Sequence, residues 1–196
     1  MELPGVSSAV LEVLKSAALD AGNPRLALVG GVVRDLLLHR CLGRLWADVP
    51  DLDWVVEGEA AQLAAVLQSR CGSQRVTAVQ EYGTFGTVAL QLDGVPLDLA
   101  TARQERYPAP AQNPVVQAGP LSADLVRRDF TINAMALDLL SGELVDPHGG
   151  LRDLEQGQLV FLHDGSVSDD PTRVIRAARY AARLGLQLSP EATHQV

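Results

Sequence analysis

Helical and strand periods alternate through the first seventy residues of the chain. In the helical segments apolar side chains recur three or four positions apart, whereas the strands are short apolar runs. The pair Asn23-Pro24 interrupts the first helical pattern and predicts its end. The expected elements are a helix over 6–20, a strand over 26–29, a helix over 32–38, a strand over 52–56 and a helix over 59–70.

The middle of the chain is rich in strand-like segments. Two apolar runs, Thr84 to Leu92 and Val95 to Ala100, are joined by Asp93-Gly94, which is a strong signal for a hairpin turn. Residues 101–120 are polar and rich in proline, so we expect a long loop there. A loop of that length in a compact domain is usually functional or mobile.

Helical patterning returns after this loop and predicts one helix over 122–136. The last helix of the chain is well delimited by its flanking residues. Ser168 or Asp169 can cap it, Pro171 suits its first turn and Gly185 suits its end.

Composition narrows the class of protein. The chain has 196 residues, of which 47% are apolar, so it can form one large domain or one domain and the start of another. No apolar run is long enough to span a bilayer and no secretory signal is present, so no membrane partner is expected. Cys41 and Cys71 suggest neither a disulfide framework nor a metal knuckle, which predicts a cytoplasmic protein.

The net charge of −8 argues against a nucleic-acid surface that covers the whole chain. The distribution of charge matters more than its sum, and arginines gather at 127–128 and along 173–183. Any nucleic-acid contact is therefore expected to be local.

A glycine pair follows the first predicted strand and precedes a helix. Gly30 and Gly31 would let backbone N–H groups approach a phosphate at the helix N-terminus, and Arg34 could reach the same anion. The segment lacks the spacing of the common phosphate-binding motifs, so an ordinary tight turn is the alternative.

Two carboxylates stand two positions apart at the start of the second strand. Side chains at i and i+2 of a strand point to the same face, so Asp51 and Asp53 would lie together while Leu52 enters the core. Adjacent carboxylates repel unless a cation neutralises them, and Mg²⁺ is typically held by one or two carboxylates and substrate phosphates. A solvated acidic pair at a strand entrance is the alternative.

A third carboxylate, Asp98, lies within an apolar strand and therefore needs a partner. It could act as a third metal or base carboxylate, or it could pair with Arg103. The sequence does not decide between these two roles.

Arginines dominate two later segments. Arg127 and Arg128 could clamp phosphates, with Asp129 orienting them and Asn133 bonding a sugar or the backbone. On the last helix four arginines fall within an arc of about 120°. Arginine, rather than lysine, favours bidentate recognition over a merely solvated face. These four residues are Arg173, Arg176, Arg179 and Arg183.

In this order the segments resemble the motifs of class II tRNA nucleotidyltransferases and bacterial poly(A) polymerases. Each motif is weak alone, but five in sequence are specific, and the resemblance covers about 26 to 185. The matching segments read GGVVRD (30–35), DLD (51–53), RRDFTINA (127–134), DPHGG (146–150) and DDPTR (169–173).

The resemblance implies an α+β fold, with a nucleotidyltransferase-type head that has a mixed β-sheet flanked by helices. Residues 1–150 would form this head and residues 151–196 the start of an all-α neck, with the body and tail absent. The implied activity is metal-dependent transfer of C and/or A from CTP or ATP to the 3′ end of tRNA, with release of pyrophosphate. No DNA partner is expected.

The resemblance also implies roles for individual residues. Asp51 and Asp53 would hold Mg²⁺ and carry catalysis. Asp170 and Arg173 would hydrogen-bond the edge of the incoming C or A base. The remaining nucleotide contacts would come from Gly31, Arg34, Arg128, Arg176 and Arg179.

One residue departs from the resembled pattern, because Asp169 stands where the family usually has Glu. A side chain that is one methylene shorter weakens any buttressing role there. A poly(A) polymerase would share these motifs, and a catalytically silent nucleotide-binding module is a rival from another class. A dehydrogenase is excluded because GxGxxG is missing.

Overall fold

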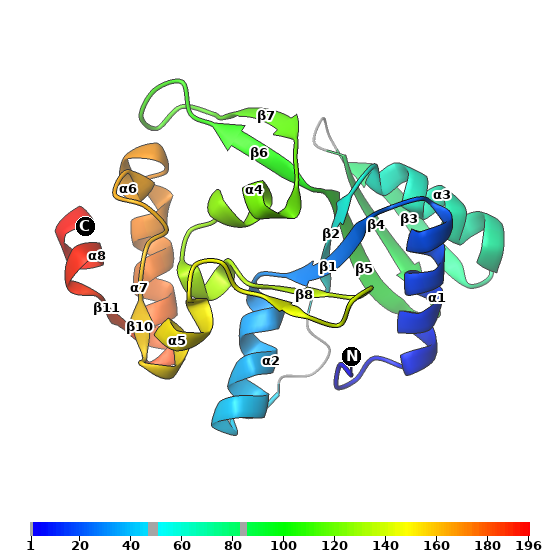
Figure 1. The fold of residues 1–196 in the computed structure, drawn as a ribbon, viewed down its shortest axis with the longest axis horizontal. Coiled ribbons are helices and arrows are strands. Elements are labelled where there is room, and N and C mark those ends of the chain that lie inside the picture. The colour runs from blue at the N-terminus through cyan, green and yellow to red at the C-terminus, as the bar shows by residue number, and fades with distance from the viewer. Residues whose placement is uncertain (1, 47–50, 83–85) are drawn as a thin grey trace.

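The computed structural model describes residues 2–46, 51–82 and 86–196. Its centre is a seven-stranded sheet with the order β3-β4-β5-β2-β1-β8-β9 (Figure 1). Strands β2 and β5 run parallel and the other neighbours run antiparallel, which confirms the predicted mixed sheet. The strands are β1 (Arg25–Val29), β2 (Asp53–Glu57), β3 (Val76–Tyr82), β4 (Thr87–Leu92), β5 (Val95–Thr101), β8 (Ala136–Asp138) and β9 (Leu144–Val145).

Helices surround this sheet, and two short strand pairs stand apart from it. The helices are α1 (Ser8–Asp20), α2 (Gly31–Leu42), α3 (Ala60–Cys71), α4 (Leu121–Val126), α5 (Gly150–Glu155), α6 (Ser166–Asp169), α7 (Thr172–Leu184) and α8 (Pro190–Gln195), with a 3₁₀ turn η1 (Thr131–Asn133). The separate pairs are β6 (Arg103–Arg106) with β7 (Val115–Ala118), and β10 (Gln158–Leu159) with β11 (Gln187–Leu188). No helix of the described ranges is long and apolar enough to cross a membrane.

The two faces of the sheet bury different clusters. Trp54 and Val56 alternate with Asp53 and Val55 along β2, so the two pairs point to opposite faces. Trp54 and Val56 belong to the main core, which also takes in the inner faces of α1 and α3. Val55 belongs to a smaller cluster with residues of α4. Asp53 therefore lies on the face that α4 covers.

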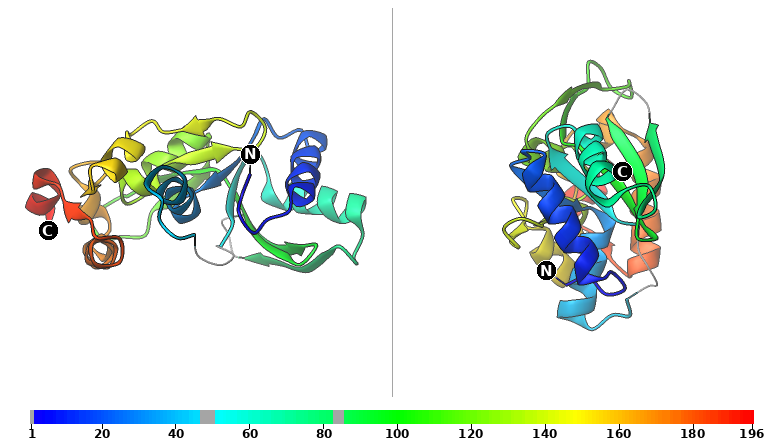
Figure 2. Two further views of the ribbon diagram at one scale, coloured as in Figure 1. Left: turned by 90° about the horizontal axis from the view of Figure 1, so that it is seen from below. Right: turned by 90° about the vertical axis from the view of Figure 1, so that its right-hand side faces the viewer.

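Helix α7 lies at the opposite end of the molecule from α1 and α3, as the views in Figures 1 and 2 agree. Its N-cap is Pro171 and it ends at Gly185, whose φ of 66° is left-handed. The end was predicted, but the predicted caps Ser168 and Asp169 belong to the short preceding helix α6.

Two predicted segments are wrong. Residues 101–120 are not a plain loop, because β6 and β7 pair there as a hairpin. The expected helix over 122–136 stops at Val126, because the following residues take part in contacts far along the chain. Phe130 forms a bridge with Phe161, and Ala136 enters the sheet opposite Val29 of β1.

The other predicted elements are confirmed within a few residues, although β3 was not foreseen. The first residues of the predicted strand that begins at Thr84 lie outside the described residues, and β4 is described from Thr87. The turn at Asp93-Gly94 joins β4 to β5 as expected.

Candidate functional site

A cavity of about 730 Å³ opens between the sheet, the start of α2 and helix α7. Its walls bring together segments that lie more than 140 residues apart in the sequence, from Gly30 to Arg183. Asp98 is the one predicted site residue that is not part of its wall. The predicted residues that line it are Gly30, Gly31, Arg34, Asp51, Asp53, Arg128, Asp170, Arg173, Arg176 and Arg179.

The glycine turn forms one wall of the cavity. Gly30 is the N-cap of α2 and has a φ of 74°, a conformation that glycine adopts without strain. A Cβ atom at Gly30 would lie 3.0 Å from Nη1 of Arg128, so the guanidinium of Arg128 stands over the turn. A Cβ at Gly31 would meet Nη2 of Arg34 at 3.4 Å.

The carboxylates line the same cavity from β2, the strand next to β1. Asp51 and Asp53 both line the cavity, whereas Leu52 between them is 1% exposed and packs in the core, as predicted. Asp98 lies directly beside Asp53 on the parallel strand β5. Partial burial raises the pKa of Asp53, Asp98 and Asp51 raise it further, and Arg128 acts in the opposite direction. This carboxylate cluster is of the kind that a bound cation stabilises.

The donor set fits a metal that is shared with a substrate. Within the described ranges, no group of three or more His, Cys, Asp or Glu side chains is arranged to hold a metal ion. Asp51 and Asp53 supply hard oxygen ligands, and Mg²⁺ usually completes its shell with phosphate oxygens and water. The residues present therefore fit a site to which the protein contributes two carboxylates.

A chain of hydrogen bonds links residues that line the cavity. Arg34, 2% exposed, donates from Nη1 to Oδ1 of Asn133 at 2.6 Å. Asn133 donates from Nδ2 to Oδ1 of Asp129 at 2.9 Å, and Oδ2 of Asp129 accepts from Nε of Arg176 at 2.7 Å. Asp129 thus orients Asn133 and Arg176, and the chain connects the glycine turn with α7.

Tyr180 lies at the centre of the arginines on this side. The guanidinium carbons of Arg34, Arg176 and Arg179 stand 5.1, 5.7 and 5.4 Å from the centre of its ring. Such cation–π contacts orient arginines without neutralising their charge. Arg176 and Arg183 are paired with Asp129 and Asp35, so among the described residues Arg173 and Arg179 are the arginines of α7 whose charge is not opposed by an ion pair.

The residues expected to read a base lie at the start of α7. Asp170 accepts from the N–H and the hydroxyl of Thr172 at 2.9 and 2.6 Å, both through Oδ1. Arg173, 4% exposed, donates from Nη2 to the carbonyl of Arg127 at 2.9 Å, and its Nη1 is buried without a partner among the described residues. Asp170 and Arg173 stand three positions apart, but no ion pair joins them among the described residues.

Residues 26–160 match the family described as the poly A polymerase head domain. The match covers more than half of the chain and includes the glycine turn, both carboxylates and Arg128. The chain belongs to this family.

Two named tRNA nucleotidyltransferases are similar to this chain in sequence. The chain is 45% identical over 168 residues to an A-adding tRNA nucleotidyltransferase of Aquifex aeolicus, covering 84% of this chain and 19% of the relative. It is 46% identical over 179 residues to a CC-adding tRNA nucleotidyltransferase of Deinococcus radiodurans, covering 89% of this chain and 45% of the relative.

Solved structures agree with this assignment. A CCA-adding enzyme in an apo form has a TM-score of 0.84 at 35% identity, covering 97% of this chain and 44% of that one. A tRNA nucleotidyltransferase complexed with a primer tRNA and an incoming ATP analog has a TM-score of 0.75 at 40% identity, covering 93% and 48%. The chain therefore spans less than half the length of these relatives.

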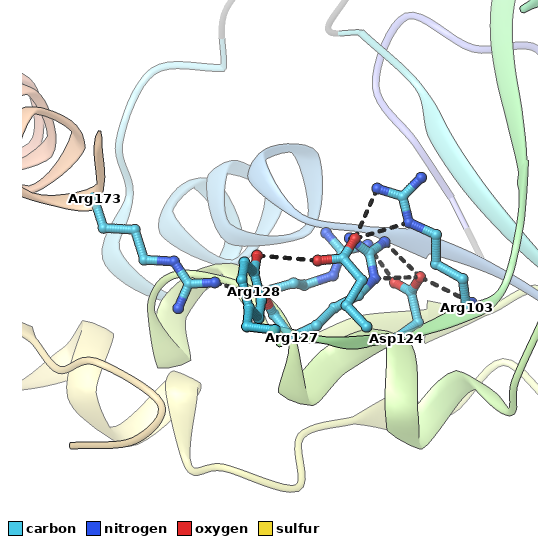
Figure 3. A network of polar contacts seen from close by, with 7 residues as sticks. Arg103, Asp124, Arg127, Arg128 and Arg173 are labelled. Atoms are coloured by element: carbon cyan, nitrogen blue, oxygen red, sulfur yellow. Dashed lines mark hydrogen bonds and ion pairs between the residues drawn. The ribbon is translucent and has the colours of Figure 1, made fainter. Parts of the chain in front are cut away.

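Several residues in or next to the candidate site were missed by the sequence patterns. Glu105 and Tyr107 of the β6–β7 segment line the cavity, as does Tyr180. Asp124 does not line the cavity, but it accepts hydrogen bonds from Arg127 and Arg128, which do (Figure 3). Tyr180 stands four positions after Arg176, a spacing that could have placed it on the arginine face. Asp124 stands three and four positions before Arg127 and Arg128, a spacing that could likewise have indicated their contact. Glu105 and Tyr107 had no such local signal.

Asp169, the position that departs from the resembled motif, lies close to a histidine. Oδ2 of Asp169 lies 3.7 Å from Nε2 of His163, on the segment before α6. Asp169 is thus directed toward this segment, and the cavity is lined by Asp170 instead.

Proposed function

We propose that the chain carries the catalytic site of a template-independent RNA nucleotidyltransferase. It adds C and/or A from CTP or ATP to the 3′ end of tRNA and releases pyrophosphate. The observation that carries this proposal is that two carboxylates, a glycine turn and the arginines of α7 line one cavity. Residues 1–150 act as the head, residues 151–196 begin the helical neck, and the protein acts in the cytoplasm.

Asp51 and Asp53 would hold the metal, for which we propose Mg²⁺. When bound, such an ion neutralises charge that develops on the transferred phosphate and lowers the pKa of the attacking hydroxyl. Asp98 lies beside Asp53 and adds negative charge. Ionised carboxylates that lie this close repel one another, so binding of a divalent cation between them is favoured.

The glycine turn and the arginines would bind the triphosphate. The N-terminus of α2 presents its N–H groups there, and Arg128 stands over Gly30. Arg34 also lines the cavity, but its bonds to Asn133 and Asp35 hold it in place, so it contributes a fixed positive charge. Preorganised charge of this kind stabilises phosphoryl transfer without moving during the reaction.

Asp170 and Arg173 would select the base. A carboxylate accepts from the amino group of C or A, and a guanidinium donates to a ring nitrogen. Uracil and guanine place a carbonyl where the amino group should be, which leaves buried groups unpaired at a cost of about 1–3 kcal/mol each. The Nη1 of Arg173, which is buried and has no partner among the described residues, supports this role.

The test is extension of a tRNA that lacks its 3′ CCA by the full-length protein, with CTP alone, ATP alone, and both. Addition of one or more C or A nucleotides that is abolished by EDTA supports the proposal. The family name makes poly(A) addition the second candidate, and a long A tail on an unrelated RNA with ATP alone would favour it. No incorporation into either RNA would overturn both candidates and leave a nucleotide-binding module.

A further inference from the structure

Three arginines and one metal-binding carboxylate form a wall between two cavities. Asp53, Arg103, Arg127 and Arg128 line the cavity described above, and the same four line a second cavity of about 480 Å³ on the β4–β5 side. The positions of these side chains therefore decide how both cavities are shaped and charged.

A single carboxylate lies beneath this wall. Asp124 of α4 has no exposed surface, and it lines neither cavity. Its Oδ1 accepts from Nε and Nη2 of Arg127 at 3.1 and 2.6 Å and from the backbone N–H of Arg103 at 3.3 Å. Its Oδ2 accepts from Nη2 of Arg128 at 2.8 Å (Figure 3). Both oxygens are thus used to fix the wall.

The bond to Arg128 has the most direct consequence. Held at Nη2, this guanidinium places Nη1 over Gly30, and its charge also acts on Asp53. Arg128 therefore stands over the glycine turn and within electrostatic range of Asp53. Without its anchor, the guanidinium would be attracted by Asp53, Asp98 and Asp51, where it would compete with a cation.

We propose that Asp124 is a positioning residue for nucleotide binding, an inference that rests on the proposed function. It holds Arg128 toward the phosphates at the glycine turn and away from the metal carboxylates. It does so without touching the nucleotide, because it is completely buried behind the arginines.

The test is calorimetric binding of ATP and of CTP in EDTA, so that metal does not contribute. Asp124→Asn places an amide N–H against the arginines and should weaken binding about tenfold or more, as expected for a lost charge-assisted contact. Arg128→Ala should weaken it to a similar extent. Since the two residues act as a unit, the double variant should bind no more weakly than the single variants.

The control is Asp93→Asn, which removes a carboxylate that receives two bonds from Arg75 on the far hairpin. Its affinity should equal that of the wild type. In activity assays Asp124→Asn should also require more Mg²⁺ for half-maximal rate, which a purely structural role would not change.

A second variant covers the case in which Asp124→Asn does not fold. Arg128→Lys keeps the charge, but a single ammonium cannot bond Asp124 and reach over Gly30 at once, so affinity should fall with the fold retained. The inference is overturned if Asp124→Asn or Arg128→Lys binds nucleotide within twofold of the wild-type affinity. It is also overturned if the affinity losses of Asp124→Asn and Arg128→Ala multiply in the double variant. A wild-type chain that binds neither nucleotide would instead overturn the proposed function.

Discussion

Replacing Asp129 with alanine is expected to cost the fold more than any exposed acidic substitution. Asp129 is 6% exposed and accepts three hydrogen bonds, from the N–H of Phe130, from Nδ2 of Asn133 and from Nε of Arg176. Alanine leaves the first two donors buried without their acceptor.

The magnitude follows from the exposure of each partner. Buried bonds to a charged acceptor contribute about 1.5–3 kcal/mol each, and the bonds from Phe130 and Asn133 are of this kind. The side chain of Arg176 is 44% exposed, so its ion pair adds less than about 1 kcal/mol. Allowing for relaxation, we expect a loss of about 3 kcal/mol, which lowers Tm by about 6–12 °C in a domain of this size.

Urea unfolding followed by circular dichroism measures this loss. The matched control is Asp20→Ala, which removes an exposed carboxylate that is paired with Arg70 on α3 and should change stability by less than about 0.5 kcal/mol. If Asp129→Ala were no more destabilising than Asp20→Ala, the buried chain of bonds from Arg34 to Arg176 would not stabilise the protein, and the reasoning would be refuted.

Three further predictions concern the site. Gly31→Val should fold, since its Cβ meets only the end of Arg34, but it should bind ATP and CTP poorly by calorimetry; normal affinity contradicts the phosphate role of the turn. Asp170→Ala and Arg173→Ala should let the full-length protein incorporate UTP or GTP, and unchanged selectivity with lower stability contradicts base reading. Burial raises the pKa of Asp124, but Arg128 and Arg127 outweigh it and hold the pKa below its ordinary 3.8. Its stabilisation is therefore complete above that value and is lost as pH falls through the folded pKa. The stability gap between the wild type and Asp124→Asn should narrow as the pH falls below 3.8 and the carboxylate becomes protonated, and a constant gap contradicts the pairing.

Local sequence patterns were sufficient to predict the segments that carry the glycine turn and the two carboxylates of the candidate site. The strand before Gly30, the turn itself and the alternation of Asp51, Leu52 and Asp53 depend on neighbouring residues only, so their geometry follows from sequence spacing. Leu52 enters the core as that alternation requires.

The remaining features depend on contacts between distant segments. Phe130 stacks on Phe161 at 4.8 Å between ring centres, and this contact overrides the helical pattern around it. The pairing of Asp124 with Arg127 and Arg128 is local, but its complete burial and its bond to Arg103 depend on the fold. The hairpin of β6 and β7 carries polar side chains without a clear alternation, so its pairing has little local signature.

The rate of nucleotide addition by Asp53→Asn in the full-length protein tests the central claim most directly. Asparagine keeps the shape of the side chain but removes the charge that would bind the metal, whereas the arginines and the glycine turn remain. With tRNA that lacks its 3′ CCA, and with CTP, ATP and Mg²⁺, we predict a rate lower by orders of magnitude while nucleotide binding in EDTA is retained. Asp93→Asn should extend the tRNA at the wild-type rate. Addition by Asp53→Asn within a few-fold of the wild type would contradict the account.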